Sequence, residues 1–126
     1  MITFEEAKTL HEASPRMTPQ ECDAVRTVGF LLTPPSRRCR HVVACIGSER
    51  KTDALNKRAS RWCLLGAVWL VAHHFKLTDR RLYALVCERI ERRKGTSLVV
   101  LWDGATELQR EDLLSRLRTT VASEGV

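Results

Sequence analysis

One cysteine and two histidines lie in the most apolar stretch of the chain, RWCLLGAVWLVAHHF, residues 61–75. Cys63 has the chemistry of a nucleophile, His73 or His74 that of its base, and Asp103 that of a carboxylate that orients the imidazole. These are the residue types of a Cys-dependent hydrolase, provided that the fold brings them together.

The spacing of these residues argues against such an enzyme. Apolar side chains fall on every side of the stretch when it is drawn as a helix, which predicts one buried helix over about residues 52–75. Cys63 and His74 are eleven residues apart, about 16 Å along a helix axis. Activated thiolates prefer helix N-termini, whereas this prediction places Cys63 inside a helix. The base would have to be His41 or His11, so we expect no catalytic residue and a protein that is not an enzyme.

Metal and nucleotide chemistry have little support in the sequence. The candidate zinc ligands are Cys39, His41 and Cys45, with Cys63 or Cys87. A structural zinc site is typically marked by a C-x₂-C or H-x₃₋₅-H pair, and neither spacing occurs. The phosphate-binding patterns G-x-x-x-x-G-K-[ST] and G-x-G-x-x-G are also missing. The sequence therefore predicts neither a metal nor another cofactor.

Positive charge is concentrated in the middle of the chain. Residues 36–94 hold fifteen Lys and Arg against five Asp and Glu, a net charge of +10, while the segments before and after carry −2 each. Such asymmetry favours an acidic or polyanionic partner, and the alternative is a solvated surface with local ion pairs. The arginines expected to contact a partner are Arg37, Arg38, Arg40, Arg58, Arg80, Arg81, Arg92 and Arg93.

Cysteine usage indicates a reducing compartment. The five cysteines are odd in number, and the first residues, MITFEEAKTL, contain two glutamates and no apolar core of a signal peptide. The longest uninterrupted apolar run, residues 62–72, is shorter than the roughly 20 residues of a membrane span. We expect a cytoplasmic protein with free thiols and no membrane association.

Length and helix signals predict a single, mainly α domain over residues 1–126, compact around the buried central helix. Capping boxes at Thr3 and Thr18 predict helices over residues 3–11 and 18–32. In the central helix, Gly66 followed by Ala67 offers a small surface that a neighbouring segment can approach closely.

The remaining elements are a helix over residues 78–95, a helix over residues 106–121, and one or two short strands over about residues 40–46 and 97–102. Residues 37–47 suit either a strand or a helix. The side chains expected to face inward on the two helices are Leu82, Leu85, Val86, Ile90, Leu108, Leu113 or Leu114, Leu117 and Val121.

Part of the chain resembles a family pattern. The matching residues are Arg61, Trp62, Cys63, Gly66 and Ala67 in an R-[FW]-C-x-x-G-A helix, then Trp102 and Asp103 in a W-[ND]-D-type turn before the last helix. Over roughly residues 53–122 the chain is similar to an uncharacterised family of small bacterial and phage proteins, from which it departs at Gly104. The resemblance implies a helical core but no activity, because none is established for that family.

These observations together favour a small non-enzymatic interaction protein. It would bind an acidic protein surface or a nucleic-acid-handling complex through the central basic face. By analogy with small phage and mobile-element products, it would inhibit host machinery, as anti-CRISPR proteins do. A direct nucleic-acid-binding protein is the alternative, although no recognition helix or RNP-like aromatic motif is visible.

Overall fold

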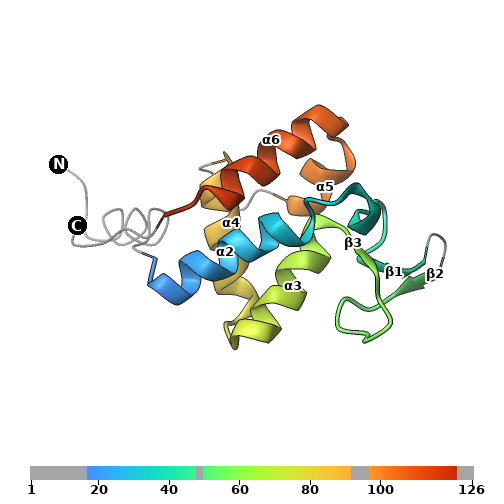
Figure 1. Ribbon diagram of the computed structural model, residues 1–126, viewed down its shortest axis with the longest axis horizontal. Helices are drawn as coiled ribbons and strands as arrows, with labels where there is room; N and C mark the ends of the chain where they lie inside the picture. The colour runs from blue at the N-terminus through green and yellow to red at the C-terminus, as the bar shows by residue number, and fades with distance from the viewer. Residues whose placement is uncertain (1–16, 48–49, 92–96, 122–126) are drawn as a thin grey trace.

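The computed structural model describes residues 17–47, 50–91 and 97–121. As predicted, the protein is mainly α, with helices gathered at one end and a small antiparallel sheet at the other (Figure 1). In chain order the elements are α2 (Pro19–Leu31), the 3₁₀ helix η1 (Pro35–Arg37), β1 (Ala44–Ile46), β2 (Arg50–Thr52), β3 (Arg61–Trp62), α3 (Leu64–Phe75), α4 (Asp79–Glu91), α5 (Leu98–Asp103) and α6 (Glu107–Arg118).

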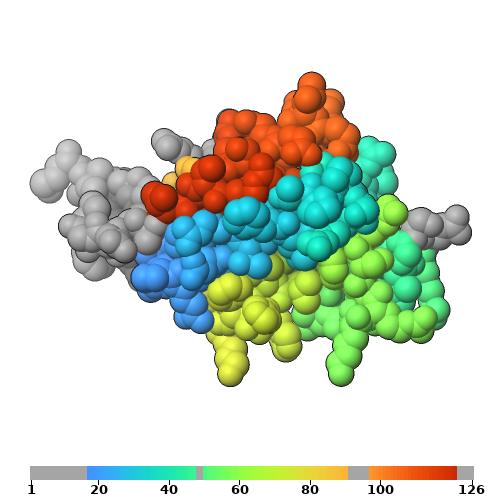
Figure 2. Space-filling view, viewed as in Figure 1, coloured from blue at the N-terminus to red at the C-terminus, as the bar shows by residue number. Residues whose placement is uncertain are grey.

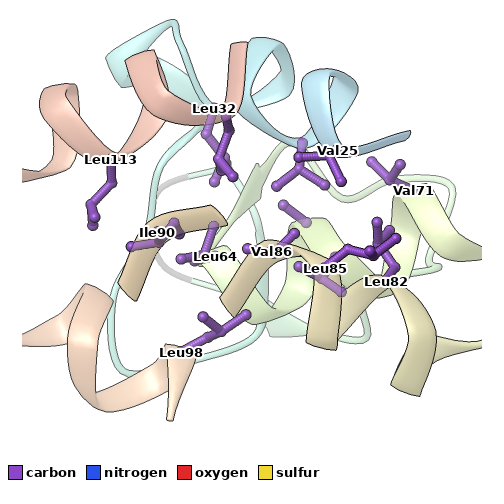
Figure 3. Close-up of a cluster of buried hydrophobic side chains, with 14 of the residues drawn as sticks. Val25, Leu32, Leu64, Val71, Leu82, Leu85, Val86, Ile90, Leu98 and Leu113 are labelled. Atoms are coloured by element: carbon purple, nitrogen blue, oxygen red, sulfur yellow. The ribbon is translucent and has the colours of Figure 1, made fainter. Parts of the chain in front are cut away.

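Helix α3 is the centre of the fold. It contacts α2, α4, α5 and β3, while α2 also packs along α6. Side chains from all five of these helices form one buried cluster, part of which is drawn in Figure 3. Each fully buried aliphatic side chain contributes roughly 1.5–3 kcal/mol, so this cluster is the main source of stability. None of the described helices is long and apolar enough to span a membrane.

Two of the predicted helix starts are confirmed by their capping hydrogen bonds. The Thr18 hydroxyl accepts from the Glu21 N–H at 3.1 Å, and the Glu21 carboxylate accepts from the Thr18 N–H at 3.0 Å. At the start of α4, the Thr78 hydroxyl accepts from the Arg81 N–H at 3.1 Å. The predicted helix over residues 3–11 lies outside the described residues.

The predicted extent of the central helix is wrong at its beginning. Helix α3 begins at Leu64, because the preceding residues are used in the sheet and in a turn. Thr52 pairs with Ala44, and Trp62 pairs with Ala44 from the other side, which gives the strand order β2-β1-β3. The Thr52 hydroxyl accepts a hydrogen bond at 2.8 Å from Asn56, so it stabilises the turn that follows instead of capping a helix.

The close approach predicted at Gly66 is present, and the partner is the backbone of the strand segment. A Cβ placed on Gly66 would lie 2.1 Å from the Val43 carbonyl oxygen, which also accepts from the Cys63 N–H at 3.1 Å. The prediction that α3 is buried on every side is wrong. Leu65 and Trp69 are partly exposed and His73 is exposed, so the described part of the fold leaves one side of α3, at positions four residues apart, open to solvent.

The C-terminal part departs from the prediction in two places. In place of the predicted strand over residues 97–102, Leu98–Asp103 form helix α5: the Ser97 hydroxyl caps it, and Leu98 and Trp102, four residues apart, are its buried positions. Helix α6 ends at Arg118, so Val121 is 73% exposed, and Leu108 in its first turn is 84% exposed. The other expected inward residues are buried. The predicted strand over residues 40–46 is confirmed only for Ala44–Ile46.

Candidate interaction surface

Arg38 does not belong to an exposed basic face. Its side chain is 6% exposed, and its guanidinium donates to the carbonyls of Leu32 and Thr33, each at 2.7 Å. It also pairs with Glu107 at 2.9 Å and with Glu111 at 2.5 Å. Arg38 therefore ties the end of α2 to α6. Its own side chain is buried, although Glu107 and Glu111 are 65% and 48% exposed, so its position does not support the predicted role as a partner contact.

Arg81 is also occupied within the fold. Its Nε lies 2.6 Å from a carboxylate oxygen of Glu21, which joins the start of α4 to the start of α2. The Arg81 hydrogen bond holds the pKa of Glu21 below its usual value, although burial of the carboxyl acts in the opposite direction. Removing Arg81 would leave the largely buried Glu21 carboxylate without its ion-pair partner. Arg81 therefore forms a structural ion pair, and its guanidinium is already bonded within the fold.

Four of the predicted partner contacts are exposed as expected: Arg37, Arg40, Arg58 and Arg80. None of them forms an ion pair with any residue that the structure describes. They lie on separate elements, since Arg37 ends η1 and Arg80 lies in the first turn of α4. The last two, Arg92 and Arg93, lie outside the described residues.

The exposed cations gather on the segment that carries the three strands, residues 40–62, which we name the sheet lobe. It holds six Lys and Arg against two Asp and Glu. It forms the right-hand end of the molecule in Figure 2, in teal and green. Five of the cations are exposed and Arg61 is partly exposed, and within the described part of the chain none has an ion-pair partner. The six are Arg40, Arg50, Lys51, Lys57, Arg58 and Arg61.

The arginines outside the lobe behave differently. Seven of them donate hydrogen bonds to carbonyls, hydroxyls or carboxylates of other elements or turns: Arg26, Arg38, Arg81, Arg89, Arg110, Arg116 and Arg118. The fold thus engages most of the arginines in the helical part and leaves the lobe cations without ion pairs in the described chain. Arg37 and Arg80, on η1 and α4, are the exceptions outside the lobe, because both are exposed and form no ion pair with a described residue. Arg50, Lys51, Lys57 and Arg61 lie in the basic block of residues 36–94, but of the cations over residues 50–61 only Arg58 is among the partner contacts expected from the sequence.

The cysteine of the opening stretch lies at a helix N-terminus, contrary to the prediction. Cys63 is the N-cap of α3, and its Sγ accepts from the Gly66 N–H at 3.4 Å. Burial raises the pKa of the Cys63 thiol, although the backbone amides of Gly66 and Leu65 act to lower it. With its side chain 3% exposed, Cys63 is a protonated, inaccessible thiol and not an activated nucleophile.

Three of the four histidines, His41, His73 and His74, are described by the structure, whereas His11, the other candidate base, lies outside the described residues. His73 and His74 are exposed in the last turn of α3, at the other end of the helix from Cys63. His41 Nδ1 lies 3.5 Å from a carboxylate oxygen of Asp103, and the His41 N–H donates to the same carboxylate at 3.1 Å. Among the described residues, no group of three or more His, Cys, Asp or Glu is arranged to hold a metal ion. All five cysteines are free thiols.

Comparison with known proteins adds no relative: no family model, no curated protein and no solved structure matches the chain. The resemblance to the uncharacterised family therefore stays a prediction. The structure does give its residues physical roles. Gly66 permits the contact with Val43, Trp102 is fully buried with its indole N–H on the Cys39 carbonyl at 2.8 Å, and Asp103 binds His41.

Proposed function

We propose that this chain is a non-enzymatic interaction protein that binds an acidic surface of another protein through the sheet lobe. One observation carries the proposal: the exposed cations of the lobe lack ion-pair partners in the described chain, while most arginines elsewhere are engaged in the fold. Fixed charges of one sign repel one another and are relieved by an acidic partner.

The proposal assigns the contacts to Arg40, Arg50, Lys51, Lys57 and Arg58, and it leaves Arg38 and Arg81 to the fold. Complementary charge at the rim of an interface mainly raises the rate of association, and it makes binding sensitive to salt. In a cytoplasmic setting, inhibition of host machinery by a phage or mobile-element product, as with anti-CRISPR proteins, is one use that such a surface supports.

Direct binding to nucleic acid is the second candidate, because the same cations suit phosphates. Base-specific or single-strand recognition also needs exposed aromatic side chains or a helix that enters a groove. Of the described aromatic side chains, only Phe30 is strongly exposed, at 57%, and it lies on α2, outside the lobe. This favours a protein partner over a nucleic acid.

Affinity purification of the full chain from its native cell, with and without nuclease, tests the proposal. The test variant is Lys57→Gln with Arg58→Gln, two exposed lobe residues whose side chains form no ion pair with the described chain. The matched control is Ala84→Glu with Ser115→Glu, at two exposed helix positions. Both variants lower the net charge from +6 to +4. They differ in where the charge is changed, on the sheet lobe in the test variant and on the helices in the control.

The expected result is a partner protein that survives nuclease treatment, is retained by the control and is recovered at least about tenfold less by the lobe variant. Equal recovery by both variants would show that net charge, and not the lobe, governs association. Recovery that requires intact nucleic acid would support the second candidate instead.

A further inference from the structure

An open hollow of about 890 Å³ lies between the sheet lobe and α3. Val42, Val43 and Thr52 form its wall on the sheet side, and Trp69 and His73 line it from α3. The close contact of Gly66 with the Val43 carbonyl fixes this wall against the helix. The hollow is therefore a feature of packed backbone, present before any partner arrives.

Trp69 differs from the other two tryptophans of the chain. The Trp62 indole N–H donates to the Ala54 carbonyl at 3.1 Å, and the Trp102 indole N–H donates to the Cys39 carbonyl at 2.8 Å. The Trp69 indole N–H donates to no described residue, and the ring is partly exposed in the hollow. Tryptophan is enriched at the energetic centre of protein interfaces, where its ring packs against the partner and its indole N–H can donate to it.

The rest of the lining adds an apolar contact and charges of both signs. Leu55, at 49% exposure, stands at the lobe side of the hollow with Lys51, while Asp53 and Asp79 also line it. Both carboxylates are exposed and can accept hydrogen bonds from hydroxyl or amide donors. The other lobe cations do not line the hollow, but Arg50 precedes Lys51 in β2, and Lys57 and Arg58 closely follow Leu55 in the chain. A ligand with its apolar group in the hollow would therefore direct its carboxylates away from Asp53 and Asp79 and toward these neighbouring cations.

We propose that this hollow receives an aliphatic or aromatic side chain from an acidic segment of the partner, with the flanking carboxylates of that segment on the lobe cations. This inference rests on the proposed function, and it names the chemistry of the partner. The apolar anchor would pack on Trp69 and Leu55 and exclude water from the charge pairs around it, which is the arrangement that strengthens an interface.

Two labelled peptides test the inference with the full-length protein. The first has one central leucine between two runs of glutamate, and the second has serine in place of that leucine. Fluorescence anisotropy should give about tenfold tighter binding of the leucine peptide. Leu55→Ser should remove this preference, and Leu108→Ser, the same change at a leucine 84% exposed on α6, should keep it.

The indole N–H resonances give a second measurement. With the Trp69 signal assigned through Trp69→Phe, the leucine peptide should shift it more than those of Trp62 and Trp102. Equal affinity for both peptides, or an unmoved Trp69 resonance, would overturn the hollow as the docking site. If both peptides bind equally and Lys57→Gln with Arg58→Gln weakens the binding of both, the hollow is not the docking site. The proposal that the sheet lobe binds an acidic partner would then still be supported.

Discussion

Gly66→Ala tests whether the sheet lobe is seated on α3 by a backbone contact. The added methyl carbon would lie 2.1 Å from the Val43 carbonyl oxygen and 3.0 Å from the carbonyl carbon. A carbon and an oxygen pack at about 3.3 Å or more, so the two segments must separate by about 1 Å. The same carbonyl accepts from the Cys63 N–H at 3.1 Å, and that hydrogen bond is lost with the movement.

The expected cost follows from three terms. Overpacking an interior contact costs about 1–3 kcal/mol. Leaving the buried Cys63 N–H without its acceptor costs about 1–3 kcal/mol. Alanine in place of glycine within a helix gains about 1 kcal/mol, which offsets part of the loss. The free energy of unfolding should therefore fall by about 1–5 kcal/mol, and Tm should fall by about 3–20 °C for a chain of this length.

Urea denaturation followed by circular dichroism measures this difference, with Gly104→Ala as the control. A Cβ at Gly104 meets only the Val100 carbonyl oxygen, at 3.2 Å, and the backbone there is right-handed at φ −85°. The control should stay within about 0.5 kcal/mol of the wild type. If Gly66→Ala also stays within that range, the close contact does not exist in solution and the wall of the hollow is not fixed.

Three further predictions concern the paired and the buried groups. Arg38→Met should lower the free energy of unfolding by about 2–4 kcal/mol in urea denaturation, because it leaves the Leu32 and Thr33 carbonyls without their donor. The two glutamates that lose their partner are exposed and add little. Arg37→Met at an exposed site should change the free energy of unfolding by less than about 0.5 kcal/mol. Because Arg81 lowers the pKa of Glu21 from its usual 4.5, that pair stabilises the fold above about pH 4.5 and ceases to do so as the pH falls through the lower folded-state pKa. The loss caused by Arg81→Gln, about 1 kcal/mol at pH 7, should accordingly shrink by pH 3 in the same assay. Burial, with help from Cys45, Cys63 and Asp103, raises the pKa of the Cys39 thiol to about 12, so the native protein at pH 8 should react with a thiol reagent far more slowly than free cysteine, while all five thiols should titrate after denaturation.

The sequence predicts helices best where the capping residues and the apolar spacing agree. Thr18 with Glu21 marks the start of α2, and Thr78 marks the start of α4, because these side chains bond to the backbone of their own first turn. Such contacts are local, so they can be recognised without knowing the rest of the fold. The same holds for the small surface at Gly66, although the sequence alone does not say what approaches it.

Predictions fail where a distant segment decides the local structure. Thr52 and Asp53 have the types of a helix start, but pairing of Thr52 with Ala44 holds the backbone extended. Val99 and Val100 favour a strand by their branching, yet burial of Leu98 and Trp102 one turn apart selects a helix. In both cases the intrinsic preference is worth less than the tertiary contact that opposes it.

The site was harder to predict than the fold because charge in a sequence does not distinguish bonded from free arginines. Arg37 and Arg38 are adjacent, but only Arg38 follows η1 at the position that turns its side chain toward the Leu32 carbonyl and the α6 glutamates. One residue of difference separates a structural ion pair from a solvated cation. The contacts with a partner must therefore be chosen from the arginines that the fold has left unpaired.

This division of the arginines also separates stability from binding. Arg38 and Arg110 are 6% and 4% exposed in their side chains, so salt in the solvent screens their interactions weakly. The lobe cations are exposed to solvent and are screened within about 8–10 Å at ordinary ionic strength. Raising the salt concentration should thus weaken association through the lobe while the free energy of unfolding changes little. If the affinity for the partner and the free energy of unfolding fall together as salt rises, the lobe charges contribute to the stability of the fold. Their lack of ion pairs would then not identify them as partner contacts.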